Sequence, residues 1–340
     1  MRYPDFLNEK DTIGFVSPSF GCAIEPYKTA FEAALSNFKR LGYSVDVGPN
    51  SDKSDGIGIS TKPEDCGREF MEYYTDKNSK CLISCGGGEL MCETIDYIDF
   101  EELKKSEPKW FMGYSDNTNM TFLLATLCDV AAVYGPCAAT FGMKPWHKSL
   151  YDAMDILAGK KKQVNSYHKW EREAVKSEDN PLAPYNVTEP TSLKVFPQGN
   201  VNISGRLIGG CLDCLSNLAG TRYDKVKEFA EKYKEDGIIW FLEACDLNVM
   251  DMRRTMWKLD RSGWFEHTKG FIIGRPYNHG QEIMGMNQYD AVTGIVSKYN
   301  VPVIMDADIG HLPPMMPIVT GSIAYVKCAD NSLSISMEYR

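Results

Sequence analysis

Residues 108–121 have the sequence Pro-Lys-Trp-Phe-Met-Gly-Tyr-Ser-Asp-Asn-Thr-Asn-Met-Thr. The apolar run from Trp110 to Met112 meets Gly113 and a polar cluster, and a second apolar run begins at Phe122. This order predicts a strand, a tight turn and a helix. Ser115 lies in the turn, where its hydroxyl would stand at the edge of a sheet beside the first free amides of the helix. A serine in this place is either a nucleophile or only the residue that caps the helix.

Strands and helices alternate on the amino-terminal side of this stretch. We expect strands over residues 11–19, 42–47 and 80–85, and helices over residues 26–40 and around residues 65–72, the latter with Asp65, Glu69 and Glu72 facing outward. The alternation continues to about residue 133 and predicts a Rossmann-like α/β domain, in which helices cover both faces of a parallel sheet. Ligands bind such sheets beyond the carboxyl ends of the strands, where Ser17, Gly86 and Ser115 would lie.

Residues 158–198 differ in composition from the segments on either side. They contain a run of three lysines, many other charged residues and four prolines, with little periodicity. A segment of this kind is usually a lid, a binding loop or a linker, and Trp170 and Tyr185 fit an ordered loop that faces a substrate. We therefore divide the chain into a domain over residues 1–157, a linker or active-site loop over residues 158–198, and a second domain over residues 199–340.

The second domain is predicted to be a smaller, mixed α/β unit. We expect helices over residues 211–219, 249–262 and 289–299, and strands over residues 201–208, 237–243, 270–274, 301–305, 322–327 and 332–337. Gly209 and Gly210 suggest a turn after the first of these strands, and Asp330-Asn331 suggests a hairpin between the last two.

Composition and charge restrict the class of protein. At 340 residues, with 43% hydrophobic and 24% charged residues, the chain suits two globular domains. A net charge of −9 argues against nucleic acid or an anionic membrane as the main partner. No stretch has the roughly 18 apolar residues that a membrane span requires. The first residues lack the apolar core of a signal peptide, so we expect a cytoplasmic protein.

The eleven cysteines do not by themselves indicate a disulfide or metal protein. Many, such as Cys81 and Cys128, lie in apolar runs, which is typical of buried, reduced thiols. Cys211 and Cys214 have the spacing of a metal or redox pair, but no second pair or nearby histidine completes a site. We predict no metal and no cofactor.

If Ser115 is a nucleophile, it needs a base, and the base needs a third group to orient it. His311 lies between Gly310 and the pair Pro313-Pro314, which would hold its loop rigid. His279 follows another strand and is the competing candidate.

Glu243 ends the apolar run that begins at Ile238. Its carboxylate would be costly to bury unless it were paired, and a histidine N–H would pair it. A strand end in solvent is the alternative.

An acyl-transfer site also needs N–H donors for the developing oxyanion. The amide of Asp116 at the helix start is one candidate, and the run Gly86-Gly87-Gly88 could bring the amide of Gly87 or Gly88 close. The same glycine run fits a phosphate-binding loop, although Met91 breaks the spacing of a dinucleotide fingerprint.

Short motifs along nearly the whole chain occur in the order found in one family of serine peptidases. They are Ser17-Pro-Ser19, Gly87-Gly88 with Ile98-Asp99, Gly113-Tyr-Ser-Asp-Asn-Thr118, Gly209-Gly210 with Leu218-Ala-Gly-Thr221, Leu242-Glu243, and Gly310-His311. With them the chain resembles the LD-carboxypeptidase family, which includes the muropeptide LD-carboxypeptidases and the microcin C self-immunity proteins. Asn117 stands where an α/β-hydrolase elbow has its second glycine, which separates the chain from that fold.

The resemblance implies a role for each candidate. Ser115 would be the nucleophile, His311, rather than His279, the general acid and base, and Glu243 its orienting carboxylate. It also implies a Rossmann-like domain followed by a smaller domain, an active site between them, no metal, and a homodimer.

The chain length and the segment over residues 158–198 look more like the microcin-immunity branch. In that branch, tryptophans of this loop stack on a nucleobase, and Trp170 is the one tryptophan of the loop here. Trp170, Ser17 and Arg275 are candidate substrate contacts. Arg206, Arg222 and Arg275 are the candidates for holding a substrate carboxylate.

The function we expect is that of a serine carboxypeptidase that removes a terminal D-amino acid from murein tetrapeptides through an acyl-enzyme. The alternative substrate is a peptidyl or aminoacyl nucleotide. Two other classes compete with this hypothesis: a two-domain small-molecule binding protein without catalysis, and a nucleotide-dependent enzyme that uses Gly86 to Gly88 as a phosphate loop.

Overall fold

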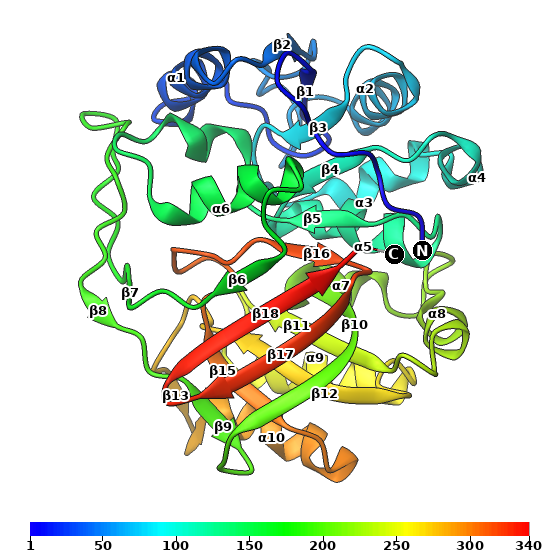
Figure 1. Ribbon diagram of the computed structural model, residues 1–340, viewed down its shortest axis with the longest axis vertical. Coiled ribbons are helices and arrows are strands. Elements are labelled where there is room, and N and C mark those ends of the chain that lie inside the picture. Colours follow the sequence, from blue (N-terminus) through cyan, green and yellow to red (C-terminus); the bar gives the residue numbers. More distant parts are fainter. Residues whose placement is uncertain (340) are drawn as a thin grey trace.

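The computed structural model describes residues 1–339, in which the strands form two main sheets, one above the other in Figure 1. The first sheet has six strands, in the order β16 (Ile318–Thr320), β5 (Ala132–Tyr134), β4 (Trp110–Gly113), β3 (Cys81–Ser84), β1 (Thr12–Val16) and β2 (Ser44–Val47). Neighbours pair in parallel except β16, which is antiparallel to β5. The predicted Rossmann-like sheet is confirmed, but its edge strand β16 comes from far along the chain.

The second sheet has eight strands and is mixed, as predicted. Their order is β6 (Gln163–Asn165), β18 (Ser332–Glu338), β17 (Ile323–Ala329), β10 (Val201–Cys211), β11 (Ile238–Glu243), β12 (Thr268–Gly274), β15 (Val303–Ala307) and β9 (Lys194–Phe196). Strands β10, β11, β12 and β15 run in parallel, and the other pairs are antiparallel. Both edge strands, β6 and β9, belong to residues 158–198, so this segment is partly built into the sheet.

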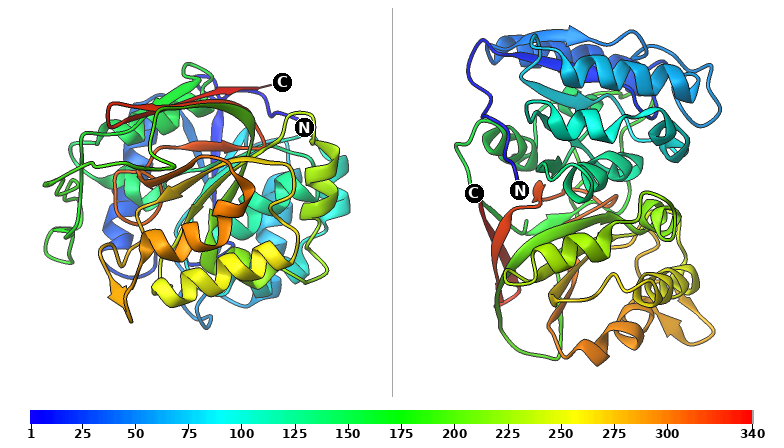
Figure 2. Two further views of the ribbon diagram at one scale, coloured as in Figure 1. Left: turned by 90° about the horizontal axis from the view of Figure 1, so that it is seen from below. Right: turned by 90° about the vertical axis from the view of Figure 1, so that its right-hand side faces the viewer.

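Helices flank the two sheets (Figures 1 and 2). They are α1 (Tyr27–Arg40), α2 (Pro63–Thr75), α3 (Met91–Thr94), α4 (Phe100–Lys105), α5 (Thr118–Thr126), α6 (Lys148–Leu157), α7 (Leu212–Leu218), α8 (Val226–Lys232), α9 (Val249–Arg261) and α10 (Gln288–Val296). Two small hairpin-like pairs lie outside the sheets: β7 (Lys169–Trp170) with β8 (Glu189–Pro190), and β13 (Glu282–Ile283) with β14 (Met286–Asn287). Over residues 1–339, no helix has the length and apolar character needed to cross a membrane.

Two apolar cores each extend through both sheets. The first core contains Trp110 of β4 and Phe241 of β11. The second core contains their neighbours Phe111 and Trp240. This is the alternation expected of strands that are covered on both faces. Because Glu243 follows Phe241 by two residues, its side chain lies on the face of β11 that carries the first of these cores.

Two local expectations are wrong. Gly209 and Gly210 do not form a turn, because β10 continues through them and pairs in parallel with Phe241 and Leu242 of β11. Glu69 does not face outward: it is buried, and its carboxylate accepts hydrogen bonds from the amides of Ser17 and Asn50. In both cases a long-range contact overrides the local pattern.

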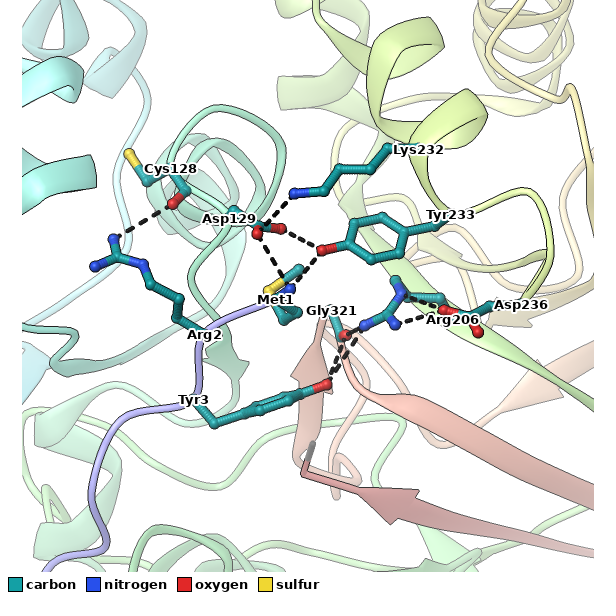
Figure 3. Close-up of polar contacts among 10 residues, drawn as sticks. All are labelled: Met1, Arg2, Tyr3, Cys128, Asp129, Arg206, Lys232, Tyr233, Asp236 and Gly321. Carbon is teal, nitrogen blue, oxygen red and sulfur yellow. Dashed lines mark hydrogen bonds and ion pairs between the residues drawn. The ribbon is translucent and has the colours of Figure 1, made fainter.

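A polar cluster fastens the two sheets together near the first residues of the chain (Figure 3). Arg206 on β10 donates from Nε to Asp236 at 3.0 Å and from Nη1 to the carbonyl oxygen of Gly321, and its guanidinium lies 3.9 Å from the ring centre of Tyr233. Tyr3 donates from its hydroxyl to the same carbonyl. Arg206 is therefore engaged in structure and does not lie at the site described below.

We expect Arg206→Met to destabilise the fold, because it removes one of the two donors of the Gly321 carbonyl and leaves the partly buried carboxylate of Asp236 without its donor. The expected loss is about 2–4 kcal/mol in the free energy of unfolding, measured by denaturant titration. The control is Arg254→Met, which removes an exposed pair with Asp251 and should cost less than about 0.5 kcal/mol. Equal losses in the two variants would contradict the role given to Arg206.

Candidate active site

Ser115 lies on the predicted turn between a strand and a helix, in the short 3-10 turn Ser115–Asn117 that joins β4 to α5. Its φ angle is +64°, a left-handed conformation that costs a non-glycine residue roughly 1–2 kcal/mol. Asn117 stabilises the turn, since its side-chain amide donates to the carbonyl oxygens of Gly86 at 2.8 Å and Tyr114 at 3.1 Å. The turn thus presents the serine hydroxyl to the ring of His311.

Ser115, His311 and Glu243 form one chain of hydrogen bonds. Oγ of Ser115 lies 2.9 Å from Nε2 of His311, and Nδ1 of His311 lies 2.9 Å from Oε2 of Glu243. With the histidine proton on Nδ1, the ring donates to the carboxylate and accepts from the serine. The competitor His279 lies elsewhere, with its ring 5.2 Å from that of Trp170 and Nε2 3.6 Å from Asp306.

Glu243 is fully buried, yet its surroundings favour the charged form. Burial alone would raise the pKa of its carboxyl group, but His311 opposes this by charge and hydrogen bonding, and the Tyr134 hydroxyl donates to Oε1 at 2.6 Å. The result is a lowered pKa, so Glu243 stays ionised.

The pKa of His311 moves in the opposite direction. Burial is the largest single effect and would lower it, but the negative charge of Glu243, the hydrogen bonds to Glu243 and Cys245 and the charge of Cys245 together outweigh burial and raise the pKa well above the usual value for histidine. The imidazolium is therefore stabilised, which is the property that a general base hydrogen-bonded to a serine requires.

Two glycines allow these groups to approach. Gly310 has a φ angle of +104°, and a Cβ atom there would lie 2.6 Å from Oε2 of Glu243. A Cβ atom on Gly87 would lie 3.2 Å from Cβ of Ser115 and 3.3 Å from its hydroxyl. A side chain at either position would crowd the reacting atoms.

The glycine run contributes free N–H groups beside Ser115. The carbonyl oxygen of Gly87 accepts from the amide of Phe20 at 2.7 Å, whereas the amides of Gly87 and Gly88 donate to no acceptor in residues 1–339. Such donors can hold an oxyanion. The competing phosphate-loop hypothesis is not supported, because the helix that follows, α3, has only four residues.

The carboxylate of Asp116 binds residues other than the catalytic candidates. This residue is buried, and its carboxylate accepts from the Ser19 hydroxyl and from the amide of Met91 at 2.8 Å. Burial raises the pKa of this carboxyl group, and these hydrogen bonds partly offset the effect. Asp116 therefore fastens the serine turn to the loops after β1 and β3.

Three adjoining cavities surround the serine and histidine. The central cavity has a volume of 360 Å³ and is lined by Ser115, His311, Tyr27 and the three glycines. The second cavity has a volume of 170 Å³, and its lining includes His311, Lys176 and Tyr185. The third cavity has a volume of 90 Å³ and is lined by Ser115 and a group of carboxylates. Lys176 and Tyr185 come from the segment over residues 158–198, which therefore contributes to the site.

The candidate substrate contacts lie outside these cavities. Trp170 is buried, donates to the Pro190 carbonyl, and stacks on Arg275, whose guanidinium is buried against Asp308. Ser17 is fully buried beside Glu69. Arg222 is exposed and pairs with Asp96. Lys176 is the cation that lines the cavity beside His311, and it has no ion pair within residues 1–339.

Sequence reasoning missed Tyr134, Ser19 and Lys176. Tyr134 ends β5 at the same sheet edge as Ser115, a position that could have signalled its role. Lys176 lies in an irregular segment, and nothing in its local sequence indicates that it turns toward the site.

A serine on a strand-to-helix turn, an imidazole and a buried carboxylate in one hydrogen-bonded chain are the arrangement of a serine hydrolase. The chain belongs to the LD-carboxypeptidase family: residues 13–135 match the model of its N-terminal domain and residues 204–326 that of its C-terminal domain. It is a family of serine peptidases.

Relatives of known name and solved structures cover almost the whole chain. The chain is 23% identical to the microcin C7 self-immunity protein MccF of Escherichia coli, over 97% of this chain and 94% of that protein. It is 22% identical to a protein of Bacillus subtilis named "Probable murein peptide carboxypeptidase", over 98% of this chain and 93% of that protein. An MccF-like protein from Bacillus anthracis has the same fold, with a TM-score of 0.83 at 20% identity, over 99% of this chain and 100% of that chain.

We expect Glu243→Gln to change the pH dependence of Ser115 reactivity. In the native protein His311 must lose its proton before it can act as a base, so the rate of labelling by a fluorophosphonate should rise with pH through a midpoint above about 6.5. Without the carboxylate, burial becomes the dominant effect on the pKa of His311, so the midpoint of the labelling rate should move to lower pH. The labelling rate itself should fall on the order of 10³-fold or more. The control Glu282→Gln, at an exposed position, should keep the native profile. An unchanged midpoint in Glu243→Gln would contradict the pairing.

Proposed function

We propose that this protein is a serine carboxypeptidase that hydrolyses the amide bond before a terminal D-amino acid in murein tetrapeptides. The observation that carries the proposal is the hydrogen-bonded chain Ser115–His311–Glu243, open to a cavity beside free glycine amides. The family resemblance supports a cytoplasmic homodimer for such an enzyme.

In the proposed reaction His311 takes the proton of Ser115 while Oγ attacks the amide carbonyl. The amides of Asp116 and of Gly87 or Gly88 hold the oxyanion. The tetrahedral intermediate collapses as His311 gives its proton to the leaving amine, and an acyl-enzyme remains. His311 then takes a proton from water, the hydroxide attacks the ester, and the acid is released as Ser115 regains its proton.

A peptide substrate is supported by the position of Trp170. Its ring is buried between Arg275 and His279 and lies outside the cavities around Ser115, so it offers no free face to a nucleobase. Lys176 supplies the positive charge that a terminal carboxylate requires, on the side of His311, the group that protonates the leaving amine.

A second candidate is the hydrolysis of an aminoacyl nucleotide. Solved structures of MccF contain aspartyl sulfamoyl adenosine or adenosine monophosphate, and they share the fold of this chain with TM-scores of 0.81 and 0.82 at 21% identity. The half-exposed ring of Tyr27 lines two of the cavities and is the candidate stacking surface, although the ammonium of Lys176 lies over it at 5.3 Å from the ring centre.

We expect the native protein, but not Ser115→Ala, to release D-alanine from a murein tetrapeptide. The same pair should be assayed on aspartyl sulfamoyl adenosine, and Ser36→Ala, on an exposed face of α1, is the matched control. Loss of turnover should be on the order of 10³-fold or more. Wild-type turnover by Ser115→Ala would overturn the nucleophile assignment, and cleavage of the nucleotide alone would favour the second candidate.

We expect Lys176→Met to weaken recognition of the substrate carboxylate. KM for the tetrapeptide should rise about tenfold with kcat nearly unchanged, because a charge-assisted hydrogen bond is lost. A tetrapeptide with a C-terminal carboxamide should be handled equally by the native protein and Lys176→Met. Lys194→Met, at an exposed site on β9, is the control. If Lys176→Met still prefers the free acid as strongly as the native protein does, another group binds the carboxylate.

A further inference from the structure

A pair of cysteines lies at the start of α7, close to Ser115 and Glu243. Cys211 ends β10 and is the N-cap residue of α7, and Cys214 is the third residue of that helix. Side chains at these two helix positions reach toward each other, as they do in a capping box. The two thiols are reduced and form a hydrogen bond with each other. No three His, Cys, Asp or Glu side chains in residues 1–339 lie close enough together to hold a metal ion, so the pair fits redox chemistry better.

Cys211 contacts Glu243, one end of the relay formed by Ser115, His311 and Glu243. Strands β10 and β11 pair in parallel with Cys211 opposite Glu243, so the two side chains lie on the same face of the sheet. Burial raises the pKa of the Glu243 carboxyl group, and a hydrogen bond from Cys211, after the charge and hydrogen bond of His311, is among the contacts that lower it. Sγ of Cys211 also lies 3.2 Å from Oδ2 of Asp213. The thiol is therefore one of the donors that hold the charged carboxylate of the relay.

Cys214 contacts the serine turn, at the other end of the relay. Its thiol donates to the carbonyl oxygen of Ser115 at 3.5 Å and lies 3.9 Å from Oδ1 of Asp116. Both thiols line the 90 Å³ cavity beside Ser115, where a small reagent reaches them. Cys214 is 8% exposed and Cys211 2%, so Cys214 is the more accessible sulfur. The pair thus contacts both ends of the relay, with one sulfur at each.

Both thiols are protonated in the reduced protein. The hydrogen bond to Cys214, burial and the charge of Glu243 raise the pKa of the Cys211 thiol well above its usual value. For Cys214, the hydrogen bond from Cys211 lowers the pKa, but burial and the charge of Asp116 outweigh it, so this pKa is raised as well. A protonated thiol is a hydrogen-bond donor, whereas a disulfide has no hydrogen to donate. Oxidation of the pair would therefore withdraw a donor from each end of the relay at once.

We propose that Cys211 and Cys214 form a reversible disulfide that lowers the reactivity of Ser115. The inference rests on the relay of the proposed function and is the same for either substrate. The oxidant is a peroxide small enough to enter the cavity. The Cys214 thiolate attacks one oxygen of hydrogen peroxide, the O–O bond breaks, and a sulfenic acid and water form once the thiol proton is taken up. The Cys211 thiolate then attacks the Cys214 sulfur, the S–O bond breaks, and the departing hydroxide leaves as water with the Cys211 proton. Two thiols and one peroxide thus give one disulfide and two waters, as two electrons pass from sulfur to oxygen.

The test measures the disulfide and the rate of fluorophosphonate labelling in the same samples. The native protein is treated with hydrogen peroxide, and half of each sample is then reduced with dithiothreitol. Trypsin cleaves after Arg206 and Arg222 and so releases both cysteines in one peptide that contains no third cysteine. Free thiols are blocked before digestion, so the disulfide is detected as the unblocked peptide, lighter by two hydrogens. The labelling rate should fall about tenfold on oxidation, because neutral hydrogen bonds to the relay are lost, and dithiothreitol should restore it.

Serine variants separate this pair from the other thiols near the site. Cys214→Ser cannot form the disulfide, so its labelling rate after peroxide should stay within about twofold of its own rate before treatment. Cys211→Ser serves the same purpose, and melting temperatures verify that each variant is folded. The matched control is Cys92→Ser, the same change in a cysteine that lines the same cavity, which should remain as sensitive to peroxide as the native protein. Cys245, beside His311, is present in all these variants, so a tenfold loss that persists without the pair would assign the effect to another thiol and overturn the proposal.

The two readouts separate this inference from the function on which it rests. A peptide that stays fully blocked after peroxide treatment would overturn the disulfide. A disulfide that forms without any change in the labelling rate would remove the control of Ser115 and leave the carboxypeptidase standing. Absence of labelling in the reduced native protein would remove the proposed reaction and, with it, the control of Ser115.

Discussion

The burial of one negative charge, that of Glu243, is the constraint on which the site depends. An ionised carboxylate with no exposure to solvent is stable only when its oxygens are paired, and leaving it unpaired costs several kcal/mol. Its two partners come from different places: Tyr134 ends a strand of the first sheet, and His311 lies in the loop after β15 of the second. The hydrogen bonds of the proposed relay therefore also connect the two sheets.

The serine turn has a comparable double role. Its left-handed residue is maintained because its neighbours are bound to separate parts of the chain: Asn117 to the glycine run, Asp116 to the loop after β1, and Thr118 to the amide of Cys211 on β10 at 3.0 Å. Each of these residues removes freedom from the turn. The Ser115 hydroxyl is thus held by rigid surroundings, which in the proposed reaction lowers the cost of reaching the geometry of attack.

Charge is distributed unevenly around the serine, and this gives the cleft a direction. One lysine and one glutamate, Lys176 and Glu171, line the cavity on the side of His311, whereas four carboxylates and no lysine or arginine line the cavity on the side of Ser115. The chemistry of the proposed relay is common to many hydrolases, whereas the distribution of charge along a cleft distinguishes the two ends of a bound substrate. The net charge of −9 shows none of this, because it sums groups over the whole surface.

Sequence alone determined the strand-to-helix turn at Ser115, the parallel sheet of the first domain and the hairpin around Asp330, since each depends on the local alternation of apolar and polar residues and on turn-forming residues. It also singled out Glu243, because a carboxylate at the end of an apolar strand needs a partner. Tertiary structure decided the features that depend on distant segments. Strand β10 continues through Gly209 and Gly210 because β11 pairs with it, and Arg206 and Arg275 form ion pairs with Asp236 and Asp308. Lys176 reaches the cavity beside His311 from an irregular loop. The physical reason is the same in each case: the energy of these residues depends on contacts with segments far away in the chain.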